Sequence, residues 1–152
     1  MPQRRPSTAG FSLLGQLITL TLAGIMIAMA VPGYLKVVPK HRLNGAVRQL
    51  VGDLMWARMK AIQRNNRYRV FFLNQHEYRV LDDADNDGAV DPGEWTFTRD
   101  LRADYEGVVM TYNNNPVFRP QGTASSLATI TLANAAGSKR VSISIAGRVR
   151  VR

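Results

Sequence analysis

The chain has 152 residues, which is enough for one domain with an attached segment and too short for two ordinary domains. Its formal net charge of +9 indicates an anionic partner, either nucleic acid or lipid head groups, without choosing between them. Because there is no cysteine, a disulfide framework and a thiolate metal site are both excluded. Six of the 11 acidic residues lie within residues 82–94, whereas residues 107–152 hold six basic residues and no acidic one.

The N-terminus consists of a short polar, basic leader followed by an apolar segment. The leader covers residues 1–10, and the segment Phe11–Val31 then runs for 21 residues without an ionisable side chain. As a helix this segment would span about 31 Å, enough to cross the hydrocarbon core of a bilayer. We therefore predict a single transmembrane helix at residues 11–32, with the basic N-terminus in the cytoplasm and the remainder of the chain outside.

Two general interpretations compete for the same segment. Ala28-Met29-Ala30 satisfies the small-x-small pattern at which a secretory signal peptide is cleaved. An ordinary membrane anchor without special processing would have the same composition. Either would leave the rest of the chain outside the cytoplasm.

Beyond the apolar segment, residues 33–66 have the pattern of an amphipathic helix, with Pro32-Gly33 and Pro39 as bends. The predicted apolar stripe consists of Leu43, Val47, Leu50, Leu54, Met55, Ala61 and Ile62. Residues 67–152 contain short alternating runs separated by Gly, Asn, Pro and Asp, which predict antiparallel strands. These runs are 68–73, 77–81, 95–99, 108–112, 128–133, 141–145 and 149–151. The expected fold class is α+β, with a long N-terminal helix packed on an antiparallel sheet.

The acidic stretch 83–94 fits the calcium-loop pattern D-x-[DN]-x-[DN]-G-x5-E at every specified position. The predicted Ca²⁺ ligands are oxygen atoms of Asp83, Asp85, Asp87, Ala89, Asp91 and Glu94. Strand-like runs flank the loop where an EF-hand would have helices. The alternative is a solvated hairpin loop without a cation, in which the crowded carboxylates would repel one another.

The last six residues alternate glycine or valine with arginine. In an extended chain this places Arg148, Arg150 and Arg152 on one face, about 6.6 Å apart, as planar donors suited to phosphate. Lys139 and Arg140 would reinforce them if a hairpin forms about Ala146-Gly147. The alternatives are protection of an exposed edge strand and attraction to anionic lipid.

Nothing in the chain predicts an enzyme. His41 and His76 are isolated, and no phosphate-binding loop, nucleophile elbow or histidine metal spacing is present. Trp56 and Trp95 are interpreted as core or helix-sheet contacts.

The junction Gly10-Phe11-Ser12-Leu13-Leu14 resembles the prepilin signature of type IV pilins and pseudopilins. This resemblance implies that a prepilin peptidase cleaves after Gly10 and methylates Phe11. It also implies assembly with other pilin subunits through the apolar helix. One departure concerns the fifth mature residue, which is glutamate in that family and is Gly15 here. The absence of this glutamate indicates a minor subunit that lies at a filament tip or is rarely incorporated.

Three later segments, 48–58, 118–122 and 147–150, are similar to the H-type pseudopilin (GspH) and FimT group. This similarity implies a pilin-like fold in the bacterial inner membrane, single-pass, with the C-terminal domain periplasmic or extracellular. In FimT-type minor pilins a Gly-Arg-x-Arg motif is associated with DNA capture in natural transformation, and residues 147–150 reproduce it. The expected partner is double-stranded DNA. The alternative within the same group is a structural subunit of a type II secretion system, or a subunit that primes a pilus, without DNA binding.

Overall fold

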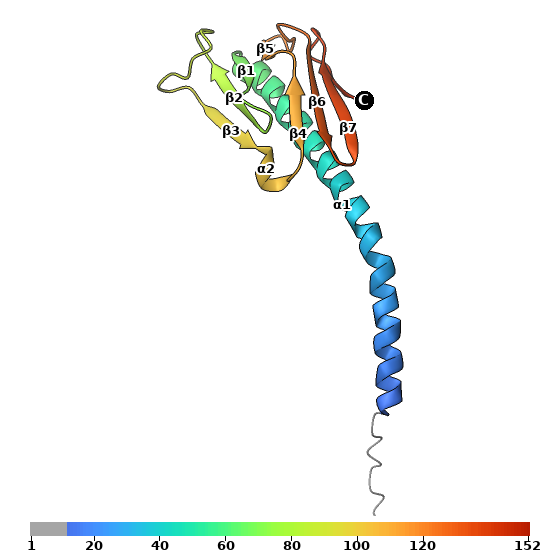
Figure 1. Cartoon of the computed structure of the whole chain (residues 1–152). Coiled ribbons are helices and arrows are strands. Elements are labelled where there is room, and N and C mark those ends of the chain that lie inside the picture. Colours follow the sequence, from blue (N-terminus) through green and yellow to red (C-terminus); the bar gives the residue numbers. More distant parts are fainter. Residues whose placement is uncertain (1–11) are drawn as a thin grey trace, which may run out of the picture. The chain divides into compact units, whose positions relative to one another are not determined.

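The computed structural model describes residues 12–152 and divides the chain into two compact units, Met1–Val37 and Val38–Arg152. One helix, α1 (Leu13–Arg64), contributes residues to both units (Figure 1). The helix continues through Pro32-Gly33 and Pro39, the positions at which the sequence predicted bends.

In the first unit, residues 12–29 expose their side chains, including the large apolar Leu13, Leu20 and Met29. The hydroxyl groups of Thr19 and Thr21 donate to helix carbonyls three or four residues earlier. These bonds satisfy the polar groups of an otherwise apolar segment, as polar residues in such helices require. Within residues 12–152, no helix combines the length and the apolarity needed to span a membrane.

In the second unit, α1 ends where Asn65 adopts a left-handed conformation with a φ of 51°. The Asn66 amide then donates to the Ala61 carbonyl at 3.1 Å, which satisfies one of the carbonyls left open at a helix C-terminus. The strands that follow are β1 (Arg67–Phe72), β2 (Glu77–Asp83), β3 (Thr96–Asp100), β4 (Val109–Tyr112), β5 (Val117–Phe118), β6 (Ala128–Asn134), β7 (Gly137–Ile143) and β8 (Val149–Val151).

The strands form two antiparallel sheets of four strands each, with orders β3-β2-β1-β5 and β4-β6-β7-β8. All seven predicted strands are present, and β7 begins four residues earlier than its apolar run. The sequence analysis missed β5, which has two residues, and the helix α2 (Leu101–Asp104). The Asp100 side chain caps α2 by accepting the Arg102 amide at 2.8 Å.

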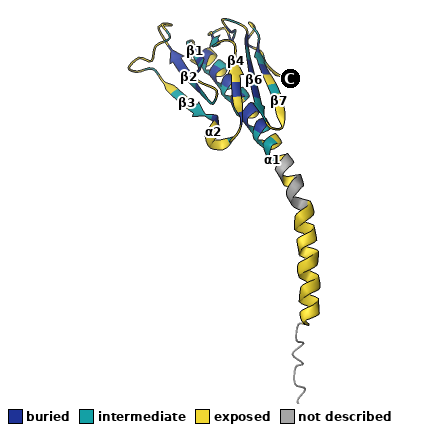
Figure 2. Ribbon diagram, in the orientation of Figure 1, coloured by how far each residue is buried: buried dark blue, intermediate teal, exposed yellow. Residues whose placement is uncertain are grey.

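The core lies between α1 and the two sheets, and buried residues gather there (Figure 2). The buried face of α1 consists of Leu43, Ala46, Val47, Leu50, Leu54, Ala57 and Ala61. Met55 and Ile62, which the sequence placed on the same stripe, are 52% and 50% exposed. Because successive helix residues are rotated by about 100°, Leu54 and Met55 cannot both face the sheets.

Two acidic side chains connect α1 to the first sheet, the half-buried Asp53 and the buried Asp82. Tyr78 of β2 donates its hydroxyl to Asp53 of α1 at 2.6 Å. Burial, reinforced by Asp53, raises the pKa of Tyr78. At the C-terminal end of α1, Asp82 accepts hydrogen bonds from Arg64, Asn66 and Tyr68 at 2.6–2.9 Å. These bonds fix the helix against β1 and β2, because leaving such a buried carboxylate without partners would be costly.

Candidate functional site

The predicted processing site, Gly10 and Phe11, lies outside the described residues, which begin at Ser12. The other predicted sites lie in the second unit. They are the basic residues of β7 and β8 and the acidic loop between β2 and β3.

The C-terminal residues form the predicted hairpin. Strands β7 and β8 pair antiparallel, with Ile143 opposite Val149 and Ser142 opposite Arg150. The turn is closed by the Ser144 amide, which donates to the Arg148 carbonyl at 3.0 Å. Beyond β8, Arg140 and Arg152 exchange two backbone hydrogen bonds of 2.8 Å. The hairpin therefore places β8 at the edge of the second sheet.

Alternation determines which basic residues share a face. Val141 and Ile143 of β7 are buried, so Arg140 and Ser142 lie on the outer face. Opposite them stand Arg152 and Arg150, and Arg148 follows on the same face next to Ser144. All four arginines are exposed. We name Arg140, Arg148, Arg150 and Arg152 the arginine edge. Lys139 belongs to the opposite face by the same alternation, so the structure does not bring it together with the arginines.

Gly147 brings the hairpin turn close to the Phe118–Gly122 turn. It has a φ of 71°, and a side chain at this position would overlap the Gly122 carbonyl oxygen. The same carbonyl accepts a 2.8 Å hydrogen bond from Arg58 Nε of α1. Gly147 is therefore required by the backbone, and it positions the residue that begins the arginine edge.

The arginine edge differs electrostatically from the arginines of this unit that form ion pairs with carboxylates. Those arginines are Arg42, Arg64, Arg69, Arg99 and Arg102. Within residues 12–152, none of the arginine-edge side chains has a carboxylate within ion-pair distance. Because residues 107–152 contain no acidic residue, this segment does not neutralise the positive charge of the guanidinium groups, which is available to an external anion.

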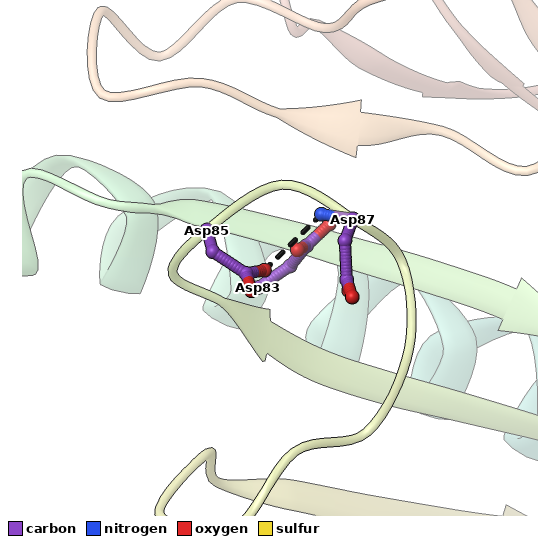
Figure 3. A group of neighbouring side chains, drawn as sticks. All are labelled: Asp83, Asp85 and Asp87. Atoms are coloured by element: carbon purple, nitrogen blue, oxygen red, sulfur yellow. Dashed lines mark hydrogen bonds between the residues drawn. The ribbon is translucent and has the colours of Figure 1, made fainter.

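The acidic loop joins β2 to β3, so strands flank it as the sequence predicted. Carboxylate oxygens of Asp83, Asp85 and Asp87 lie within 4.8 Å of one another (Figure 3). Hard oxygen ligands at this separation are of the kind that Ca²⁺ binds. The loop is a tight turn, in which Gly88 has a φ of 79° and its amide donates to Asp83 at 3.4 Å.

Asp83 is buried, and its charge already has a partner. Arg69 of β1 donates to Asp83 Oδ2 through Nε at 2.7 Å, and its Nη2 lies 2.6 Å from the same oxygen in an ion pair. The sequence analysis treated the loop carboxylates as mutually repelling and did not identify this arginine. Only the strand pairing of β1 with β2, with Arg69 opposite Leu81, brings it to the loop.

The remaining predicted ligands are arranged differently. Glu94 accepts backbone amides of the loop itself, from Ala84 at 2.8 Å and from Asp91 at 3.3 Å. The neighbouring charge of Asp87 is the main cause that raises the pKa of the exposed Asp91. Three of the six predicted ligands, the aspartates at 83, 85 and 87, are thus gathered within the described residues.

The two histidines and the two tryptophans occupy structural positions in the second unit. His76 Nδ1 lies 3.1 Å from the Val108 carbonyl oxygen, and His41 is exposed on α1. Trp56 of α1 packs on Trp95 at a centroid distance of 4.9 Å, next to Phe97. The tryptophans therefore form a helix-sheet contact, as predicted, although Trp95 remains 42% exposed.

Comparison with solved structures finds this fold among minor subunits of bacterial filaments. The type IV minor pilin FimU of Pseudomonas aeruginosa has a TM-score of 0.60 at 19% identity, covering 74% of this chain and 90% of the FimU chain. The minor pseudopilin EpsH from the Type 2 Secretion System of Vibrio cholerae has a TM-score of 0.58 at 13% identity, covering 73% and 96%. The fold is thus α+β and pilin-like, as predicted. No curated protein matches the chain significantly.

The family profile described as Type II transport protein GspH matches residues 46–147, more than half of the chain. The chain therefore belongs to the GspH family, and by family it is a structural protein and not an enzyme. The matched region ends at Gly147, so Arg148, Arg150 and Arg152 lie immediately outside it.

Proposed function

We propose that this GspH-family protein is a minor subunit of a type IV pilus that holds double-stranded DNA on its arginine edge during uptake. The single observation that carries the proposal is the arginine edge itself. Four guanidinium groups share one exposed face without carboxylate partners among the described residues. Planar guanidinium donors match phosphate geometry, and contacts to phosphate carry no base information. Binding is therefore expected to be independent of sequence and sensitive to salt.

A structural role is the second candidate function, and the family supports it directly. The matching profile is described as a type II transport protein, and EpsH belongs to a type 2 secretion system. On this alternative the chain is an H-type minor pseudopilin or a pilus-priming subunit, and the arginines protect the edge strand β8 from unwanted pairing. Attraction of the same arginines to anionic lipid is a further outcome to be tested.

The N-terminal part of the proposal concerns processing and location. Prepilin peptidase would cleave after Gly10 and methylate Phe11, leaving the apolar part of α1 to anchor the subunit in the inner membrane. The same segment would pack against other pilins, with the C-terminal domain periplasmic or extracellular. Gly15 supports a tip or rare position, because it has no carboxylate to pair with a neighbouring N-terminal amine. N-terminal sequencing that finds Met1 intact would instead indicate an independent anchored domain.

A calcium ion in the acidic loop is a separate part of the proposal. It is supported by the three aspartate carboxylates that lie within 4.8 Å. Asp83, Asp85 and Asp87 would hold the ion, with the Ala89 carbonyl, Asp91 and Glu94 completing the shell. The ion would order the loop and would have no catalytic role.

DNA binding is tested with the full chain in a non-ionic detergent, using a duplex of roughly 30 base pairs at several salt concentrations. Changing Arg148, Arg150 and Arg152 to Gln should weaken binding. It should also reduce the slope of log K against log salt by about three, since each of these arginines is expected to neutralise one phosphate. The matched control changes Arg48, Arg67 and Arg79 to Gln, which removes the same charge elsewhere. Equal binding by both variants, or none by the unchanged chain, would leave the structural alternative. Vesicles with anionic lipid provide the lipid comparison.

A further inference from the structure

The outer face of the second sheet carries a line of polar side chains that begins at the arginine edge. Strand register places Thr111 of β4 opposite Thr131 of β6, and Thr131 opposite Arg140 of β7. Arg140 in turn faces Arg152 through their reciprocal backbone bonds. Directly opposed residues of a sheet point to the same face, so these four side chains form one row across the strands. In Figure 1, β4, β6 and β7 lie side by side, with the C-terminus beyond β7.

A second row runs parallel to the first. It contains Thr129 of β6, Ser142 of β7 and Arg150 of β8. Asn113 extends it, because its side-chain oxygen accepts the Thr129 amide at 2.7 Å. A hollow of about 440 Å³ lies on this face, lined by Thr111, Tyr112, Asn113, Thr129, Thr131 and Arg140.

The chemistry of this face suits a phosphate backbone. Threonine, serine and asparagine side chains are common donors to DNA phosphates, next to arginine and lysine. The sheet contains no acidic residue, since all of its strands lie within residues 107–152. The acid just before β4, Glu106, is paired with Arg42 at 3.1 Å.

The width of the face favours a duplex. From β8 to β4 there are three strand spacings, which amount to about 14 Å. That span is comparable with the major groove of B-DNA, which is about 12 Å wide between its two backbones. A single strand lying along the arginine edge would not reach β4.

Resting on the function proposed above, we infer that Thr111 of β4 binds the second phosphate strand of a duplex whose first strand lies on the arginines of β8. Thr131 and Arg140 lie on the two strands between them. Thr111 thus makes the surface selective for double-stranded DNA. It contributes a neutral hydrogen bond, which releases no counterions and leaves the salt slope to the arginines.

The test changes Thr111 to Val in the full chain, leaving every arginine in place. Valine keeps the shape and the strand preference, and thermal unfolding verifies the fold. We expect duplex affinity to fall about threefold to tenfold, in line with the loss of one neutral hydrogen bond. The salt slope and the affinity for a single strand of equal length should stay unchanged. Thr98→Val, on the exposed face of β3 in the other sheet, is the matched control.

The outcomes separate this inference from the function on which it rests. If the unchanged chain binds duplex and the arginine variant does not, but the threonine variant binds like the unchanged chain, the threonine contact is overturned and the DNA function stands. An equal loss for single strands would also overturn it. If the unchanged chain binds no DNA, both proposals fail.

Discussion

Arg140 and Arg152 stand directly opposite each other at the end of the β7–β8 hairpin, where their backbones exchange two hydrogen bonds of 2.8 Å. Their side chains lie on the same exposed face, and no carboxylate pairs with either among the described residues. Like charges in directly opposed positions destabilise a sheet. The arrangement is therefore costly for the isolated protein and favourable once an anion lies between the two guanidinium groups.

This relationship predicts that Arg140→Gln stabilises the isolated protein. At low salt the free energy of unfolding should be about 0.5 kcal/mol higher for the variant than for the unchanged chain, because the repulsion between the opposed charges is removed. The gain should vanish at high salt, where exposed charges are screened. Urea unfolding measures both values. Arg79→Gln, an arginine opposite Thr98 in the other sheet, should show no such gain. A salt-independent gain would contradict the electrostatic explanation.

Gly147 should tolerate no side chain. In Gly147→Ala the new Cβ would overlap the Gly122 carbonyl oxygen, and the left-handed φ would add strain. We expect unfolding free energy to fall by roughly 2–4 kcal/mol, which combines the conformational and steric costs. Gly107→Ala is the matched control, since Gly107 has a φ of 81° with open space around it. Equal losses of unfolding free energy in the two variants, measured by urea unfolding, would show that the overlap with the Gly122 carbonyl does not contribute to the loss.

The raised pKa of Tyr68 predicts a loss of stability at high pH. Burial, together with the hydrogen bond to Asp82, raises the pKa of Tyr68 to about 12 from the ordinary 10.0. As pH rises from about 10 to 12, the unfolded chain releases this proton before the folded chain does. The contribution of Tyr68 to stability is therefore fully present below about pH 10. Above that pH the free energy of unfolding should fall by up to about 1.4 kcal/mol for each pH unit. Tyr78 acts in the same direction, so Tyr68→Phe should make the decline shallower without abolishing it. Identical slopes in urea unfolding series would refute the assignment.

The acidic loop should report cation binding through its neighbouring tryptophan. Trp95 follows Glu94 directly, so terbium bound in the loop should show luminescence sensitised by tryptophan, and calcium should displace it. Asp87→Asn should weaken binding at least about tenfold, because it removes one of the three gathered carboxylates. Asp104→Asn, which removes an exposed acid outside the loop, is the control. Binding should weaken as pH falls and the carboxylates protonate, with Asp91 protonating earlier than an ordinary aspartate. Absence of terbium luminescence in the unchanged chain would contradict cation binding and leave a loop held by Arg69 and Glu94.

Residue spacing determined much of this protein before any tertiary information. The helical recurrence from Leu43 to Ala61 predicted the buried stripe, and two-residue alternation predicted the strands and the face shared by Arg148, Arg150 and Arg152. These properties are local, because a side chain's direction follows from its position in a regular element. The resemblance in the leader and in later segments likewise needs only adjacent residues.

Only the tertiary structure decided which distant residues meet. Strand pairing divided the strands into two sheets, brought Arg69 to Asp83, and aligned Thr111 and Thr131 with Arg140. It also showed that Lys139 lies away from the arginine edge and that Met55, next to the buried Leu54, stays exposed. Register and packing depend on how the whole chain shares one core, and a shift of one residue reverses every side chain of a strand. The local pattern therefore specified the elements and their faces, while the contacts that shape both candidate sites arose from pairing between segments far apart in sequence.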